Sequence, residues 1–111
     1  MSLNVFIVED HTMVRSGIRA LLEASPELNV VGEASNGREA VEQIQKLVPD
    51  LVLMDVAMPE LNGIDAARQI HDAVPSTRII MLSMHDERQY VFESLKAGAT
   101  GYVLKAAAFQ D

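Results

Sequence analysis

Five side chains suited to metal and phosphoryl chemistry follow apolar runs in this sequence of 111 residues. Glu9 and Asp10 follow the first run, Asp55 follows a central run, and Ser83 and Lys105 follow two later runs. Clustered carboxylates repel one another, so either one is protonated or a cation lies among them. Carboxylate oxygens suit Mg²⁺. With that charge balanced, Asp55 could attack an anionic substrate, as in aspartyl-phosphate chemistry.

Ser83 and Lys105 fit phosphoryl-transfer chemistry at Asp55. Lys105 would neutralise charge on the transferred group, and the Ser83 hydroxyl would form a hydrogen bond to one oxygen of that group. Catalysis would then rest on positioning and charge stabilisation. His11 follows the acidic pair without an evident partner, and we expect it to be an ordinary loop residue. A plainer interpretation of Asp55 also stays open, namely a solvated acid at the end of a strand.

Buried strands and amphipathic helices must position these groups. The run 51–54 is wholly apolar, as in a strand covered on both faces of a parallel sheet. Pro59 and the turn-forming pair Asn62-Gly63 follow it. The strands are expected at 4–9, 28–35, 51–55, 77–83 and 102–104. The helices are expected at about 13–24, 36–48, 64–74 and 86–97, with a fifth beginning at 106–111.

Local signals mark several helix ends. We expect Thr12 to cap the first helix and Asn36, with Glu39 as its reciprocal partner, to cap the second. The pair Asp86 and Gln89 has the same spacing, and Gly98 suits the left-handed position after a helix.

The first helix has two apolar faces. Its expected core stripe comprises Val14, Ile18, Leu21 and Leu22. A second face, of small or apolar residues, comprises Met13, Gly17, Ala20 and Ala24. A helix beside a sheet needs one buried stripe, so we expect the second face to be a docking surface; ordinary packing is the alternative.

Strand–helix alternation predicts an α/β fold with a parallel sheet and helices on both faces. Right-handed crossovers favour a flavodoxin-like, doubly wound, five-stranded sheet of order 2-1-3-4-5. Ligands of such sheets bind outside the carboxyl ends of the strands, where all the candidate residues fall.

Composition narrows the function classes. Hydrophobic residues make up 49% and aromatics 5%, so we expect one domain with an aliphatic core. A net charge of −7 repels nucleic acids and anionic membranes. The sequence has no Cys, so it offers neither disulfides nor thiolate metal sites. No signal peptide and no apolar membrane span is recognisable. These three features fit a cytoplasmic chain.

These motifs together resemble the receiver domain of two-component response regulators. The resemblance covers essentially the whole chain, and the segments Asp-His-Thr-Met-Val-Arg-Ser-Gly-Ile and Ala-Gly-Ala-Thr-Gly-Tyr are similar to those of the NarL/LuxR-type subfamily. The residues that carry it are Glu9, Asp10, Asp55 in Asp-Val-Ala-Met-Pro, Ser83, Tyr102 and Lys105.

The resemblance implies that Asp55 accepts a phosphoryl group from a histidine kinase or a small phosphodonor. It implies Mg²⁺ bound by Asp10, Asp55 and the Ala57 backbone carbonyl, with Glu9 acting through water. Such a domain is a phosphoacceptor that catalyses its own phosphorylation and dephosphorylation, and it is not a turnover enzyme.

The resemblance further implies that Ser83 and Tyr102 rearrange on phosphorylation and alter the face formed by the fourth helix, the last strand and the fifth helix. The kinase would dock on Met13, Gly17, Ala20 and neighbouring loops, and a homodimer is conceivable. Residues 1–111 would form one receiver domain with most of its fifth helix absent. DNA would be bound only through an absent C-terminal helix-turn-helix domain.

Three alternatives stay open. A haloacid-dehalogenase-type phosphatase uses similar groups, but it needs a second Asp where Ala57 stands. A flavodoxin-like cofactor binder needs a phosphate loop after the first strand, where Glu9 and Asp10 would repel phosphate. A receiver fold could also act as an interaction module without phosphorylation.

Overall fold

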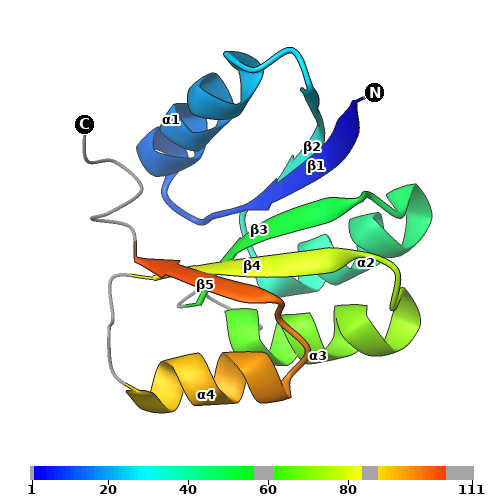
Figure 1. The fold of residues 1–111 in the computed structure, drawn as a ribbon, viewed down its shortest axis with the longest axis vertical. Coiled ribbons are helices and arrows are strands. Elements are labelled where there is room, and N and C mark those ends of the chain that lie inside the picture. Colours follow the sequence, from blue (N-terminus) through cyan, green and yellow to red (C-terminus); the bar gives the residue numbers. More distant parts are fainter. Residues whose placement is uncertain (1, 57–61, 84–87, 105–111) are drawn as a thin grey trace.

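A computed structural model describes residues 2–56, 62–83 and 88–104, and these form alternating strands and helices (Figure 1). The elements are β1 (Leu3–Val8), α1 (Thr12–Glu23), β2 (Leu28–Ala34), α2 (Gly37–Leu47), β3 (Leu51–Asp55), α3 (Gly63–Ala73), β4 (Arg78–Ser83), α4 (Arg88–Lys96) and β5 (Gly101–Leu104). The expected fifth helix at 106–111 lies outside the described residues.

All strand pairs in the sheet are parallel, and the strand order is β2-β1-β3-β4-β5. The predicted flavodoxin-like topology is therefore confirmed. Val8 pairs with Met54, and Asp55 pairs with Leu82. This register aligns the ends of β1, β3 and β4, so the residues that follow them meet at one edge of the sheet.

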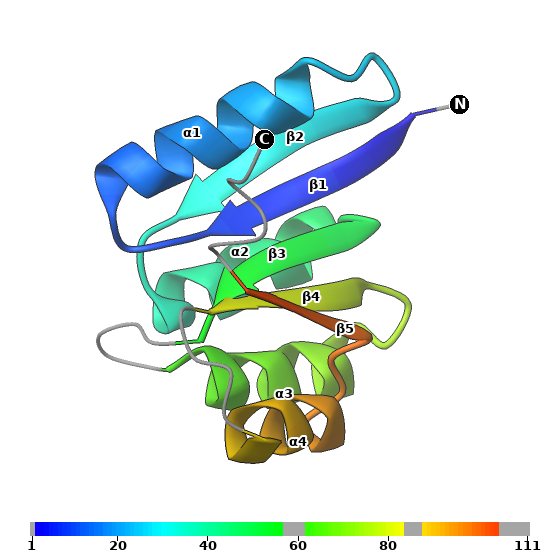
Figure 2. The same cartoon turned by 60° about the vertical axis from the view of Figure 1, so that its left-hand side comes forward.

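Helices lie on both faces of the sheet, as expected. Among the described helices, α2, α3 and α4 cover one face, and α1 covers β1 and β2 on the other (Figure 2). The larger core lies under α2, α3 and α4 and contains Val52, Met54 and Ile70. A smaller core joins Ile18 of α1 to Ile7.

The expectation of an aliphatic core was wrong at one position. Phe6 is fully buried in the larger core. A Cβ added to Gly32, on the neighbouring strand, would lie 2.6 Å from Phe6 Cε2. The missing side chain of Gly32 therefore provides the space that the aromatic ring occupies.

The start of α1 differs from the prediction. Thr12 is already helical, and the N-cap is His11, whose side chain makes no capping bond. The His11 amide instead donates to Glu9 Oε2 at 3.1 Å, and the His11 carbonyl accepts from the Arg15 amide. Because an acid of the preceding loop binds this amide, the helix starts one residue earlier than a threonine cap would allow.

The predicted core stripe of α1 was wrong at Leu21, which is 57% exposed. The buried stripe follows Val14, Ile18 and Leu22, one residue in four. Leu21 lies at the border of this stripe, on the same side as the small residues. Met13 is 88% exposed, so the second face is open to solvent as expected.

Helix ends elsewhere largely follow the sequence signals. Asn36 caps α2 by accepting from the Glu39 amide at 2.8 Å. Asn62, expected in a turn, caps α3 by accepting from the Asp65 amide at 2.9 Å. Gly98 has a φ of 113°, which confirms the left-handed position after α4. Asp86 lies outside the described residues.

The part of the chain that the structure describes contains no helix that is both long and apolar enough to span a membrane.

Candidate functional site

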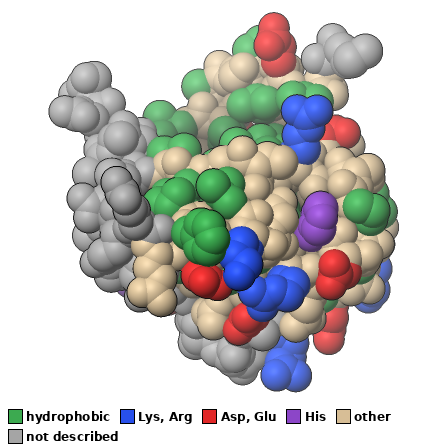
Figure 3. Space-filling view, turned by 60° about the horizontal axis from the view of Figure 1, so that its bottom comes forward, with side chains coloured by type: hydrophobic (Ala, Val, Ile, Leu, Met, Phe, Trp, Pro, Cys, Tyr) green, Lys and Arg blue, Asp and Glu red, His purple; other side chains and the backbone are tan. Residues whose placement is uncertain are grey.

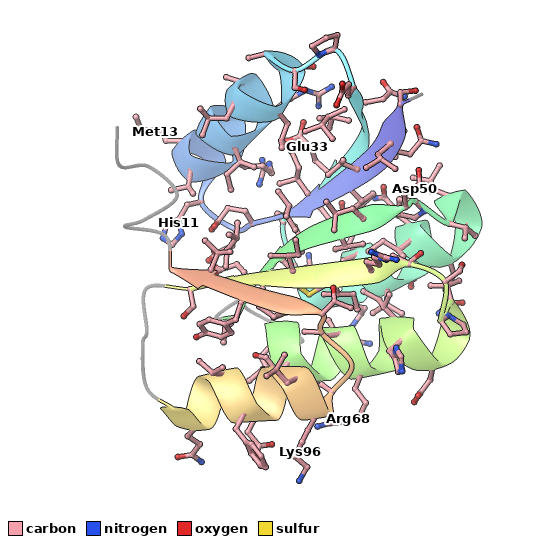
Figure 4. All side chains as sticks on the ribbon, viewed as in Figure 1. His11, Met13, Glu33, Asp50, Arg68 and Lys96 are labelled. Atoms are coloured by element: carbon pink, nitrogen blue, oxygen red, sulfur yellow. The ribbon has the colours of Figure 1, made fainter. Side chains whose placement is uncertain are left out.

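Four ionisable side chains meet at the carboxyl edge of the sheet. Each of Glu9, Asp10, His11 and Asp55 offers a ligand atom, and these atoms all lie within 4.8 Å of one another. Figure 4 shows His11 at this edge and Asp50 at the opposite end of the sheet. The structure thus brings together the three acids that the sequence singled out, and it adds a histidine.

Two of the acids are buried. Glu9 is 0% exposed and Asp55 is 4% exposed. The interpretation of Asp55 as a solvated strand-end acid is therefore wrong. Burial removes water that would otherwise screen neighbouring carboxylates, so this cluster strongly favours a positive charge among its oxygens.

His11 is part of the acidic site, contrary to the expectation of an ordinary loop residue. Its Nδ1 atom lies 3.2 Å from Glu9 Oε2 and 3.2 Å from Asp10 Oδ1. Spacing alone did not reveal this, because a residue next to two acids can turn either way. The His11 ring lies over the two acids while most of its side chain is exposed to solvent.

A network of arginines fixes the loop that carries these acids. Arg15 Nη1 donates to the Glu9 carbonyl at 2.7 Å, and Arg15 Nε donates to Glu33 Oε1 at 3.0 Å. Arg19 also binds Glu33. The hydrogen bond to Glu33 and a second one to Glu23 raise the pKa of Arg19, so this guanidinium stays charged. Sequence analysis missed this network because its members are far apart in the chain.

The backbone around Asp55 is held closely by two elements. The Val56 amide donates to the Leu82 carbonyl at 3.0 Å, and the Gly63 amide donates to the Val56 carbonyl at 2.8 Å. A Cβ on Gly63 would lie 2.0 Å from the Asp55 carbonyl oxygen. Only glycine therefore lets α3 start this close to the acid.

The remaining predicted residues divide into two groups. Ser83 is buried at the end of β4, one residue beyond Leu82, the register partner of Asp55. Tyr102 on β5 is partly buried against the larger core. Lys105 and Ala57 lie outside the described residues, so their predicted roles stay predictions.

The donor set at this edge fits a divalent cation. The described residues supply carboxylate oxygens from Glu9, Asp10 and Asp55. Hard cations such as Mg²⁺ prefer oxygen ligands and keep several waters, and Asp10 and His11 border solvent on the open side. The group can therefore hold an ion without rearrangement of the strands.

Comparisons with known proteins agree with this site. The response regulator receiver domain family matches residues 5–111. The transcriptional regulatory protein DegU of Brevibacillus brevis is 40% identical over 103 residues, which is 93% of this chain and 44% of DegU. The chain spans about half the length of the curated relatives it matches.

Solved structures give the same result. The signal receiver domain of the response regulator NarL from Mycobacterium tuberculosis has a TM-score of 0.90 and 36% identity, covering 94% of this chain and 84% of that one. A chain of the CheX–CheY–BeF₃–Mg²⁺ complex from Borrelia burgdorferi matches with a TM-score of 0.88 and 28% identity. The match covers 93% of this chain and 78% of that one.

The predicted resemblance is thus confirmed, including its NarL/LuxR-type character. Sequence, strand order and the acidic edge of the sheet all agree. This chain belongs to the response regulator receiver domain family.

Proposed function

We propose that this domain is a phosphorylation switch in which Asp55 accepts a phosphoryl group. The burial of Asp55 beside Glu9 and Asp10, at the carboxyl edge of the sheet, is the observation that carries the proposal. A buried carboxylate with few waters around it is a better nucleophile than a solvated one, provided that nearby charge is balanced.

In the transfer step, an Asp55 carboxylate oxygen forms a bond to phosphorus while the bond from phosphorus to the donor breaks. The donor leaves with that electron pair, and Asp55 becomes an acyl phosphate. Asp10, Asp55 and the Ala57 carbonyl would hold Mg²⁺, with Glu9 acting through water. Bound there, Mg²⁺ would neutralise the carboxylates and the oxygens of the phosphoryl group.

Ser83 and Lys105 would bind the transferred group. Ser83 is suited to this because it is buried one residue beyond the register partner of Asp55. Its hydroxyl would donate to a phosphoryl oxygen, and Lys105 would neutralise another. Hydrolysis of the acyl phosphate at the same site would reset the switch.

The signal would then pass to the surface formed by α4 and β5. Ser83 turning toward the phosphoryl group would let Tyr102 move, which changes this surface. Figure 3 views the molecule from the side of α3 and α4, where hydrophobic side chains lie beside Lys and Arg. Phe92 and Leu95 of α4 are exposed here, and Lys96 Nζ lies 5.5 Å from the centre of the Phe92 ring.

We further propose a sensor histidine kinase as the phosphodonor, docking on the α1 face of Met13, Gly17 and Ala20 and on neighbouring loops. Met13 and Ala20 are exposed, as such a surface requires. Residues 1–111 would form the receiver of a longer regulator whose output domain binds DNA, and a homodimer of this chain is compatible with that role. The similarity to DegU, a transcriptional regulatory protein, supports this proposal.

Intact-mass spectrometry tests the proposal. The chain is incubated with acetyl phosphate, with Mg²⁺ or with EDTA. We expect one phosphoryl adduct with Mg²⁺ and little with EDTA. Asp55→Asn should abolish the adduct, because it removes the nucleophile while keeping the side-chain shape.

Asp50→Asn is the matched control, since Asp50 is an exposed acid at the other end of the sheet (Figure 4). Its adduct should equal that of the wild type. Loss of the adduct in both variants, or in neither, would contradict the assignment.

A further inference from the structure

We propose that Arg15 is a positioning residue for the cation site, because it holds the loop from Glu9 to His11 that presents two of the acids. The inference rests on the proposed function, since it assigns the residue that orients ligands of Mg²⁺ there. Arg15 contacts neither the cation nor the phosphoryl group in this proposal. It acts through the backbone of the loop.

Arg15 binds this loop at both ends. Its guanidinium donates from Nη1 to the Glu9 carbonyl at 2.7 Å, and its backbone amide donates to the His11 carbonyl at 2.9 Å. Asp10 lies between these two points. The Glu9 carbonyl belongs to the planar peptide group that leads into Asp10, so holding its oxygen fixes the plane from which Asp10 departs. The direction of the Asp10 carboxylate therefore depends on Arg15.

Strand β2 holds both the loop and the guanidinium. The Glu9 amide donates to the Ala34 carbonyl at 3.0 Å, and Arg15 Nε donates to Oε1 of the preceding residue, Glu33, also at 3.0 Å. The Arg15 and Glu33 side chains are 20% and 26% exposed, so this charge-assisted bond is largely shielded from solvent. The guanidinium is thus kept in the orientation in which Nη1 meets the Glu9 carbonyl.

The charge of Arg15 makes the inference testable by sign. A guanidinium beside the site repels Mg²⁺, so loss of the charge alone would strengthen Mg²⁺ binding. Loss of the bond to Glu9 would let Asp10 turn and would weaken Mg²⁺ binding, because groups that orient metal ligands strongly affect affinity. Glu33 compensates the charge of Arg15, whereas the bond to Glu9 is short, so we expect the loss of positioning to outweigh the relief of repulsion.

Isothermal titration calorimetry with Mg²⁺ tests the inference on the wild type, Arg15→Met and Arg15→Lys. Methionine keeps the aliphatic stem and removes both side-chain bonds, so we expect the Mg²⁺ affinity to fall about tenfold. Lysine keeps the charge but lacks the planar fork that binds Glu9 and Glu33 together, so its affinity should lie between those of Arg15→Met and the wild type. Equal or tighter Mg²⁺ binding by Arg15→Met would overturn the inference. If Arg15→Met did not fold, wild-type affinity in Arg15→Lys would overturn it instead.

Arg19→Met is the matched control. Arg19 lies one turn further along α1, binds the same acid, Glu33, and also pairs with Glu23. Its replacement removes one positive charge, as Arg15→Met does, but leaves the bond to the Glu9 carbonyl in place. We expect its Mg²⁺ affinity to change less than about twofold. A tenfold loss in Arg19→Met as well would show that the order of Glu33, and not the bond to Glu9, controls the site.

Backbone NMR relaxation in EDTA gives a readout that needs no metal. The Asp10 amide of the wild type should have an order parameter of about 0.85, as in rigid backbone, and that of Arg15→Met should fall toward about 0.6. The amides of β1 should keep their wild-type values in both proteins. An Asp10 amide that is equally rigid in wild type and Arg15→Met would contradict the positioning role.

Phosphorylation by acetyl phosphate separates this inference from the proposed function. In Arg15→Met, the Mg²⁺ concentration that gives half of the maximal phosphorylation rate should rise about tenfold, while the rate at saturating Mg²⁺ should change less than about threefold. An unchanged Mg²⁺ dependence would overturn the role of Arg15 and leave Asp55 as the acceptor. Absence of an adduct in a wild type that binds Mg²⁺ would overturn the phosphorylation of Asp55 alone, because the Mg²⁺ affinities of the variants test Arg15 independently.

Discussion

Arg15 donates a 2.7 Å hydrogen bond to the backbone carbonyl of Glu9, and thereby ties helix α1 to the acidic loop. The same guanidinium binds Glu33 of β2, so one side chain joins a helix, a loop and a strand. Both Arg15 and Glu33 are mostly buried, which protects these bonds from solvent screening.

Arg15→Met should lower the free energy of unfolding by about 1–2 kcal/mol, because it removes charge-assisted bonds while keeping the aliphatic stem. Urea denaturation checks the value. Arg68→Met is the control, since the Arg68–Asp65 pair is exposed and should contribute less than about 0.5 kcal/mol. Equal losses in both variants would show that Arg15 has no special structural role.

Asp10→Asn should stabilise the metal-free chain by about 1 kcal/mol, because it removes one of the clustered negative charges. It should also reduce the rise in melting temperature that Mg²⁺ causes in the wild type, since it removes a ligand. Thermal unfolding in EDTA and in Mg²⁺ measures both effects. A lower melting temperature of Asp10→Asn in EDTA would contradict this prediction. It would mean that the contacts of the Asp10 carboxylate stabilise the fold by more than the repulsion between the acids destabilises it.

Gly63→Ala should lower the free energy of unfolding by about 3 kcal/mol or more. The added Cβ would lie 2.0 Å from the Asp55 carbonyl oxygen, and this clash could be relieved only by moving the backbone. Any variant protein that folds should be phosphorylated more slowly, because the Asp55 backbone would be displaced. Gly101→Ala serves as control, since its Cβ would make an ordinary contact 3.5 Å from Ile80 Cγ1. A stable, fully active Gly63→Ala protein would disprove the close approach.

Val48→Gly should raise the free energy of unfolding by about 1 kcal/mol. Val48 ends α2 with φ 44° and ψ 63°, a left-handed conformation that strains a β-branched residue and suits glycine. Leu47 lies one residue earlier and is still helical, so Leu47→Gly should instead lower the free energy of unfolding by about 1 kcal/mol. Chemical denaturation distinguishes the two signs, and destabilisation by Val48→Gly would refute the argument.

Patterns within short segments predicted much of this molecule. Apolar runs ending in acids marked β1 and β3, and alternation of elements led to the strand order. Asn36 and Gly98 were recognised from local chemistry that acts within a few residues. The acidic edge followed from topology alone, because parallel strands place their carboxyl ends together.

Features that depend on tertiary contacts escaped prediction. The exposure of Leu21 could not be read from spacing, because it depends on how α1 rests on two strands. The place of His11 depends on the Glu9 carboxylate that binds its amide. Arg15 and Glu33 lie 18 residues apart and meet only when α1 packs on β2.

The most direct test of the central claim is to locate the phosphoryl group. The chain is incubated with acetyl phosphate and Mg²⁺, the acyl phosphate is reduced with borohydride, and the resulting homoserine is mapped by peptide sequencing in the mass spectrometer. Homoserine at position 55 alone, absent with EDTA, is the predicted result. Homoserine at another acid, or none in a folded sample that binds Mg²⁺, would contradict phosphorylation of Asp55 and favour a receiver that signals without phosphate.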